Sequence, residues 1–161
     1  MAKEKPPVTA AVRFLRSEKV DFTDHIYTYE EKGGTSASSR ELGVDEHSVI
    51  KTLVMEDEMG QPLIILMHGD RQVSTKELAR IMGVKQISPC PLDIAQKLTG
   101  YLVGGTSPFG TRRRMPVQME ESIAKLEYIY INGGKRGYLV GMKPSELIRV
   151  LKPVLVTVGI K

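Results

Sequence analysis

The sequence has no tryptophan, three phenylalanines and one cysteine among its 161 residues. Few aromatic rings are available to stack on bases, which argues against a stacking platform for single-stranded nucleic acid. The lone Cys90 excludes an internal disulfide and suits a reducing compartment. The longest apolar run, residues 63–67, is too short to cross a bilayer, and the N-terminus has no signal-peptide pattern. We therefore expect a cytoplasmic protein without a membrane association.

Several chemical signatures are missing as well. The three histidines lack the spacing of a zinc site, and neither G-x-S-x-G nor H-E-x-x-H occurs. Residues 133–135 lack the upstream glycine and the following hydroxyl residue of a P-loop. Ser107 has no adjacent His–Asp pair to activate it, and Cys90, between two prolines, is interpreted as a packed thiol. We expect no metal, no other cofactor and no protein nucleophile.

What is present is typical of one compact domain. Hydrophobic residues make up 41 % of the chain and charged residues 26 %, and the formal net charge is +4. This mild basic bias is compatible with a polyanionic partner such as RNA, although many enzymes are equally basic. No repeat or linker is evident. We expect a flexible tail over residues 1–8 and a single domain over residues 9–161.

Helices and strands are mixed without regular alternation. Ser74 and Glu77 form a capping box, and Gly43 is placed to end a helix. Helices are predicted over residues 9–19, 39–42, 74–82, 91–98 and 144–151. Strands are predicted over residues 22–29, 49–55, 62–67, 84–87, 116–119, 126–131, 137–140 and 154–158, with a polar surface loop over residues 30–39. This order favours an α+β domain with a mixed, curled sheet over a doubly wound fold.

Two glycine-rich segments, residues 100–110 and 132–137, stand out. Glycine lets the backbone turn sharply or approach a ligand closely, and consecutive free N–H groups can bind a carboxylate, a phosphate or an oxyanion. Two tight turns of a small β-rich domain are the alternative interpretation. Basic residues beside both segments favour a site: Arg112, Arg113 and Arg114 follow the first, and Lys135 and Arg136 belong to the second.

Lys51 is the most informative single residue, because it interrupts an apolar, β-branched strand. A buried ammonium loses hydration free energy unless it finds a partner or reaches a cleft. Lys51 is either a strand-edge residue that extends to water or a fixed cation at the rim of a pocket, where it would bind a carboxylate or phosphate. Tyr27 and Tyr29 are interpreted as pocket wall and core. Such a set of residues suits the orientation of a substrate that supplies its own reactive group.

Three motifs resemble the signatures of the YbaK/EbsC family: VIKTL at residues 49–53, TGYLVGGTSPFG at residues 99–110 and YINGGKRG at residues 130–137. That family is related to the editing domain inserted in bacterial prolyl-tRNA synthetases, and the resemblance extends over about residues 8–156. It implies a barrel-like mixed sheet surrounded by helices. It also implies a free-standing trans-editing deacylase that hydrolyses the ester between a wrong amino acid and the terminal adenosine of tRNA, typically cysteinyl-tRNA(Pro).

The resemblance also implies roles for particular residues. Lys51 would hold the substrate near the scissile ester and is the expected catalytic residue. The expected substrate-binding residues are Tyr29, Thr52, Gly104, Gly105, Ser107, Asn132 and Gly133. Arg112, Arg113, Lys135 and Arg136 are expected to face the backbone of the tRNA acceptor end, and a prolyl-tRNA synthetase is a candidate partner. No metal or cofactor is implied.

The chain departs from the family pattern at three places. Asn132 replaces a small Ser, Leu139 replaces an Asp, and the loop after Tyr29 is shorter, without a counterpart to a pocket-lining Phe. These positions shape the amino-acid pocket, so the preferred amino acid stays open. The chemistry also stays open. Either the substrate thiol attacks its own ester and releases a thiolactone, or water cleaves the ester. A non-catalytic module that binds tRNA, a synthetase or a small ligand is the alternative function.

Overall fold

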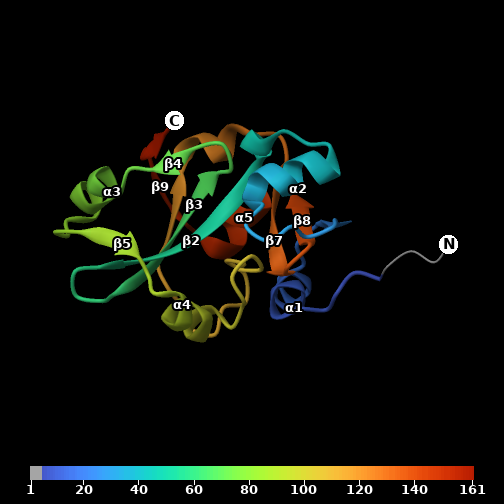
Figure 1. Ribbon diagram of the computed structural model, residues 1–161, viewed down its shortest axis with the longest axis horizontal. Coiled ribbons are helices and arrows are strands. Elements are labelled where there is room, and N and C mark those ends of the chain that lie inside the picture. The colour runs from blue at the N-terminus through green and yellow to red at the C-terminus, as the bar shows by residue number, and fades with distance from the viewer. Residues whose placement is uncertain (1–4) are drawn as a thin grey trace.

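The computed structural model describes residues 5–161 (Figure 1). The described α-helices are α1 (Ala10–Ser17), α2 (Gly34–Leu42), α3 (Thr75–Met82), α4 (Leu92–Thr99) and α5 (Pro144–Leu151), and short 3₁₀ helices are η1 (Glu46–Ser48) and η2 (Glu121–Lys125). The strands are β1 (Thr23–Ile26), β2 (Val49–Asp57), β3 (Pro62–His68), β4 (Gln72–Val73), β5 (Ile87–Pro89), β6 (Val117–Glu120), β7 (Ile129–Lys135), β8 (Tyr138–Met142), β9 (Val154–Val156) and β10 (Gly159–Ile160). None of the helices in this part of the chain has the length and apolar character to cross a membrane.

The main sheet combines antiparallel and parallel pairs in the order β1-β8-β7-β2-β3-β6-β9, and β5 also pairs with β2. β2 and β3 form the expected hairpin, with Gly60 at a φ of 76° in its turn. β7 pairs in parallel with β2, and β3 pairs in parallel with β6. The helices lie around this sheet (Figure 1). The prediction of an α+β domain with a mixed sheet is confirmed.

β2 changes partners along one of its edges. Val49 and Ile50 pair in parallel with β7, whereas residues 55–57 pair with β5. Between these two pairings, residues 51–54 have a strand partner on the β3 side. Sheets commonly bind ligands at such switch points, because a crevice opens where neighbouring strands diverge. The change of partner therefore provides room for a pocket beside Lys51.

Two apolar clusters pack on opposite faces of the β2–β3 hairpin. Ile50 and Leu66 belong to the cluster beneath α1 and α5, and Leu53 and Met67 pack with the cluster beneath α3. Because side chains alternate along a strand, Lys51 shares a face with Leu53 and lies opposite Ile50. The apolar neighbours of Lys51 in sequence therefore anchor the strand on both faces and fix where the ammonium points.

Some predicted boundaries were wrong. α2 begins at Gly34, so residues 34–38, predicted as surface loop, are helical. The sequence of this helix is polar and does not indicate that one of its faces is packed, although Ala37, Ser38 and Ser39 are buried. Strand β5 is displaced to Ile87–Pro89 from the predicted residues 84–87, and β9 ends at Val156. Residues 1–4 of the predicted tail lie outside the described residues, and the domain limits stay a prediction.

Candidate functional site

A cavity of about 620 Å³ lies where β2 changes partners. Its walls come from β2, α2, the glycine loop of residues 100–110, and strands β7 and β8. Its size is in the range of small-molecule sites. Six of the residues predicted from the sequence line it together: Tyr29, Lys51, Thr52, Gly104, Asn132 and Arg136. The predicted Gly105, Ser107 and Gly133 do not line this cavity.

Lys51 is half-buried at the cavity wall, and its ammonium donates a hydrogen bond to the main-chain carbonyl of Arg71. Burial lowers the pKa of Lys51, while the nearby carboxylates of Glu46 and Asp70 act in the opposite direction. An ammonium has three N–H donors, so one bond to a carbonyl leaves others to offer a ligand. Lys51 therefore lies at the wall of a pocket, on the edge of β2 that has no described strand partner over residues 51–54, so both sequence interpretations describe part of its position.

Thr52, the next residue on the same strand, has a buried hydroxyl group without a hydrogen-bond partner in the described part of the chain. Its hydroxyl oxygen is the one buried polar side-chain atom among the described residues that has no hydrogen-bond partner. Buried polar groups are nearly always paired, and the exceptions point to a water, a ligand or a functional strain. Thr52 also lines the cavity. The position next to Lys51 thus has unused hydrogen-bonding capacity.

The glycine loop closes over the pocket through Gly104. Its φ of 87° is in the left-handed region, and a Cβ there would lie 2.5 Å from the Tyr29 hydroxyl oxygen. Asn132 Nδ2 donates a hydrogen bond of 3.0 Å to the carbonyl oxygen of Gly104. Only glycine combines that backbone angle with such close contact. Gly104 is therefore locked between Tyr29 and Asn132, at the mouth of the pocket.

The second glycine segment differs from the expectation of free N–H donors. Asn132 Oδ1 accepts hydrogen bonds from the amides of Gly134, at 2.7 Å, and Lys135, at 3.2 Å, within a register shift of β7. The Gly133 carbonyl accepts a bond of 2.5 Å from the Thr9 hydroxyl, and a Cβ on Gly133 would collide with the Tyr138 ring. These N–H groups are already used inside the protein, so the segment supports the pocket rather than lining it with donors.

Gly105 and Ser107 make hydrogen bonds inside the first glycine loop. The Gly105 amide donates a 2.8 Å bond to the Leu102 carbonyl, and Ser107, which is fully buried, accepts one of 3.2 Å from the Phe109 amide. The Tyr101 hydroxyl donates to the Phe109 carbonyl at 2.5 Å, and burial raises the pKa of Tyr101 to about 12. These contacts fold the loop onto itself, and they place the Ser107 hydroxyl away from the pocket.

The basic residues separate into two groups. Arg112, Arg113, Lys135 and Arg136 are all exposed, but they differ in their contacts. Arg136 has a defined place, because its Nε donates a 2.7 Å bond to the Val103 carbonyl and its guanidinium lies 5.3 Å from the centre of the Tyr29 ring. Arg136 thus ties the two glycine segments together and lines the cavity, a role that the sequence did not indicate.

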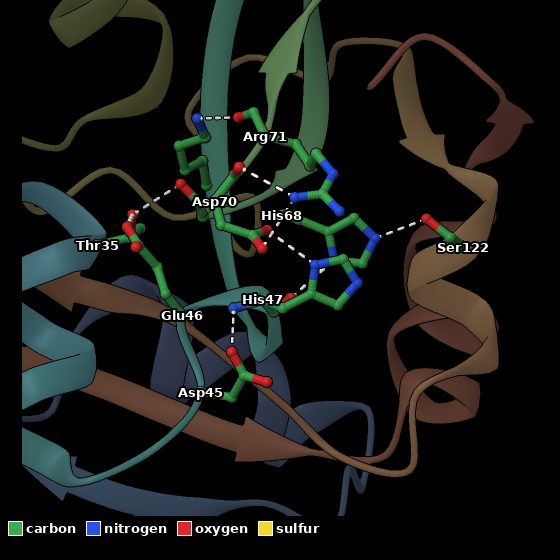
Figure 2. Close-up of polar contacts among 10 residues, drawn as sticks. Thr35, Asp45, Glu46, His47, His68, Asp70, Arg71 and Ser122 are labelled. Carbon is green, nitrogen blue, oxygen red and sulfur yellow. Dashed lines mark hydrogen bonds and ion pairs between the residues drawn. The ribbon is translucent and has the colours of Figure 1, made fainter. Parts of the chain in front are cut away.

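A cluster of histidine and aspartate was missed in the sequence, where His47 is 21 and 23 positions from its partners His68 and Asp70 (Figure 2). His47, His68 and Asp70 each offer a potential metal-ligand atom, and these atoms lie within 4.8 Å of one another. The two imidazole rings, however, are stacked at 3.7 Å and 5° from parallel. Imidazole binds a metal in the plane of its ring, so stacked rings cannot share one ion without turning. The arrangement favours a hydrogen-bonded network over a metal centre.

The fold and the site together define a class: a single α+β domain with a lysine-bearing pocket under a glycine loop. Residues 30–150 match the model of the aminoacyl-tRNA editing domain. The chain therefore belongs to the aminoacyl-tRNA editing domain family, and the resemblance to YbaK/EbsC proteins is confirmed.

Two relatives illustrate the range of that family. The "Putative Cys-tRNA(Pro)/Cys-tRNA(Cys) deacylase EbsC" of Enterococcus faecalis is 28 % identical over 92 % of this chain and 92 % of its own length. The proline–tRNA ligase of Thermodesulfovibrio yellowstonii is 31 % identical over 90 % of this chain, but the match spans 24 % of that enzyme. The same domain therefore occurs both as most of a chain and as part of a larger synthetase.

Solved structures share the fold at lower identity. A "putative trans-editing enzyme for prolyl tRNA synthetase" superposes with a TM-score of 0.82 at 17 % identity and covers 96 % of this chain and 99 % of its own. "Hypothetical protein APE2540" gives a TM-score of 0.85 at 20 % identity and covers 94 % of this chain and 99 % of its own. These similarities confirm the mixed α+β architecture.

Proposed function

We propose that the protein is a trans-editing aminoacyl-tRNA deacylase, with Cys-tRNA(Pro) as its first candidate substrate. One observation carries the proposal: the Lys51 ammonium is held at the wall of a pocket that Gly104 of the glycine loop also lines. A cation and a close-approach glycine in one pocket suit an acyl ester, which has a polarised carbonyl and little bulk. The family match and the name of the relative EbsC support the choice of reaction and substrate.

In this proposal Lys51 is the catalytic residue and donates to the oxygen atoms of the acyl or terminal-ribose end. A donor fixed in advance stabilises developing negative charge without reorganisation. Tyr29, Thr52, Gly104 and Asn132 form the substrate-binding wall. Gly105, Ser107 and Gly133 would act on the substrate through the loops that they shape.

Cys90 also lines the cavity, but it is buried and burial raises the pKa of its thiol, which disfavours the reactive thiolate. In this proposal the substrate therefore supplies the reactive group. For a cysteinyl ester, the side-chain thiol would attack its own carbonyl carbon. A carbon–sulfur bond forms, the ester carbon–oxygen bond breaks, and the thiol proton passes to the departing ribose oxygen. The products are a thiolactone and free tRNA. Correct orientation of such an intramolecular attack accounts for a large share of the rate.

The exposed Arg112, Arg113 and Lys135 would contact phosphates of the acceptor end, together with the free edge of the Arg136 guanidinium. Phosphate contacts position a nucleic acid without reading its sequence. The identity of the tRNA would then come from a prolyl-tRNA synthetase acting as partner, in the cytoplasm. The match to a proline–tRNA ligase supports that choice of partner.

A deacylation panel tests the function. The purified protein is incubated with cysteinyl-, alanyl-, seryl- and prolyl-tRNA(Pro), and the released product is analysed with a thiol trap. We expect cysteinyl-tRNA to be cleaved fastest, with a trapped thiolactone adduct, and prolyl-tRNA to be spared. Equal cleavage of alanyl- and cysteinyl-tRNA, with free amino acids as products, would overturn the thiol mechanism. No release from any of them would overturn the deacylase proposal in favour of a non-catalytic binding module.

A further inference from the structure

We propose that Asp70 and His47 are positioning residues for Lys51: they fix the turn whose Arg71 carbonyl accepts the hydrogen bond from the Lys51 ammonium. This inference rests on the proposed function of Lys51. Neither residue lines the pocket. Both act through the short connection between β3 and β4, residues 69–71, which does not line the pocket either.

The connection is tied to the strand that carries Lys51. The Gly69 amide donates a 2.7 Å bond to the Val49 carbonyl, two residues before Lys51, and the Arg71 amide donates one of 3.1 Å to the His68 carbonyl. A Cβ on Gly69 would lie 2.7 Å from both the Glu46 carbonyl oxygen and the Thr35 hydroxyl oxygen. The turn thus packs directly against η1 and α2, and a small shift of it moves the carbonyl that holds Lys51.

Asp70 fixes that turn from both ends of its carboxylate (Figure 2). Its Oδ1 lies 2.8 Å from His47 Nδ1, and its Oδ2 accepts a 3.0 Å bond from Arg71 Nη1. Surface ion pairs usually contribute little. Here one contact ties the turn to His47 of η1, and the other reaches the side chain of Arg71, whose backbone carbonyl is the acceptor for Lys51. Together they link the turn to η1 and to the residue that holds the ammonium.

His47 is itself held on three sides. Its amide donates a 3.0 Å bond to Asp45 Oδ1, and its ring stacks on His68. His68 Nδ1 donates a 2.7 Å bond to the His47 carbonyl, so its Nε2 accepts from the Ser122 hydroxyl at 2.6 Å. A continuous chain of contacts therefore runs from Ser122 on η2, through the two histidines and Asp70, to the carbonyl that binds Lys51.

The same groups set the charge environment of Lys51. The carboxylates that act on it are those of Glu46 from η1 and Asp70 from the turn. The charged side chains of Glu30, Glu31, Lys32 and Arg136 line the same cavity. Thr35 on α2 holds the Glu46 carboxylate through a 2.8 Å bond. Both carboxylates raise the pKa of Lys51 against the larger effect of burial. Removal of the Asp70 charge should therefore lower the pKa of Lys51 further.

Two variants of Asp70 separate orientation from charge. Asp70→Ala removes the hydrogen bonds and the charge, whereas Asp70→Asn removes the charge and keeps two polar atoms of the same shape. With cysteinyl-tRNA(Pro), we expect Asp70→Ala to lower kcat by about 10- to 100-fold with little change in KM, because small displacements of a catalytic group are costly. Asp70→Asn should recover much of this loss at neutral pH. His47→Ala should resemble Asp70→Ala.

A pH series supplies a readout that a merely structural role would not move. We expect the alkaline limb of the pH–rate profile to shift to lower pH in Asp70→Asn, because Lys51 loses its proton more easily. The Lys51 titration, followed by NMR of a sample labelled at lysine Cε, should shift in the same direction. Asp21→Asn, an exposed aspartate between α1 and β1, serves as a control for the change in net charge.

The two proposals can fail separately. If the wild-type protein cleaves no aminoacyl-tRNA, the proposed function is wrong, and the NMR titration still tests the link between Asp70 and Lys51. If the wild type is active but the kcat of Asp70→Ala and the titration of Lys51 in Asp70→Asn both equal the wild-type values, the positioning role is wrong. Thermal melts identify variants that fail to fold, and the titration in Asp70→Asn then decides.

Discussion

The main chains of Gly105 and Arg136 approach each other so closely that a Cβ on Gly105 would lie 2.9 Å from the Arg136 amide nitrogen and 3.1 Å from the Lys135 carbonyl carbon. This contact joins the two glycine segments of the sequence. It also holds Gly104, the residue before Gly105, at the pocket. The glycines of the first loop are therefore needed for the meeting of two backbones as well as for a turn.

Gly105→Ala tests that contact. The added methyl group should push the two segments apart and destabilise the protein by about 1–3 kcal/mol. The deacylation rate should fall by more than the loss of folded protein explains, because Gly104 moves with Gly105. Gly60→Ala is the control: its φ is 76° but its Cβ would meet nothing within 4 Å, so it costs about 1–2 kcal/mol of backbone strain far from the pocket. Equal activity of the two variants would contradict the proposed role of the contact.

Lys51→Met tests the catalytic assignment while keeping the length of the side chain. We expect deacylation to fall by about 100- to 1,000-fold, the usual range for loss of one transition-state donor. The fold should persist, because burial makes the ammonium costly and methionine suits the same environment. Lys76→Met, at an exposed lysine on α3, should leave activity unchanged. Near-normal turnover by Lys51→Met would show that the site assignment is wrong.

Much of the site could be read from the sequence, since it depends on local patterns. A lysine in a β-branched run must face a pocket or an edge, and Gly104 stands in a glycine-rich motif. The contact of His47 with His68 could not be predicted in this way. These residues are 21 positions apart, and they meet because β2 and β3 pair as a hairpin, so that His68 returns beside the start of β2.

Two other features needed tertiary information. Apart from Ala37, residues 34–38 are not strong helix formers, and their helix is stabilised by the burial of Ala37 and Ser38. The sequence predicts that Arg136 faces the tRNA backbone, which stays a prediction, but it does not indicate the contact that Arg136 makes within the protein. Its bond to the Val103 carbonyl joins loops separated by 33 positions, and no periodicity in either loop indicates that contact.

The exposed arginines allow a test of tRNA binding. Charge reversal at Arg112 and Arg113 should weaken binding of tRNA and reduce the slope of log K against log[salt] by about 1–2, because each lost phosphate contact releases about one counterion fewer. The preference among amino acids should not change. Reversal of Lys76 and Arg80 on α3 gives the same change in net charge as a control. An unchanged slope in the Arg112 and Arg113 variant would indicate a solvated turn instead.

His68 makes the stability of the protein depend on pH. Burial lowers the pKa of His68, so the unfolded chain binds a proton more readily than the folded protein. Stability is therefore full above the unfolded value of about 6.5 and falls as the pH drops through the lower, folded value. The melting temperature should drop less between pH 7 and pH 5 in His68→Asn than in the wild type. Ser122→Ala, which keeps the titrating ring, should retain the larger drop. Equal drops in the wild type and His68→Asn would exclude His68 as the cause.

Leu139 provides the test of amino-acid selectivity. It lines the cavity beside Asn132, its partner in the β7–β8 pairing, and is 4 % exposed. Leu139→Ala should enlarge the pocket and raise the relative rate for larger aminoacyl groups over cysteine by about 10- to 100-fold, because small differences in an apolar pocket are worth 1–3 kcal/mol. Loss of a buried leucine also destabilises by about 2–5 kcal/mol. Leu147→Ala on α5, fully buried outside the cavity, should cost similar stability and keep the selectivity of the wild type. If both variants show the same selectivity in the deacylation panel, Leu139 does not set the size of the accepted amino acid.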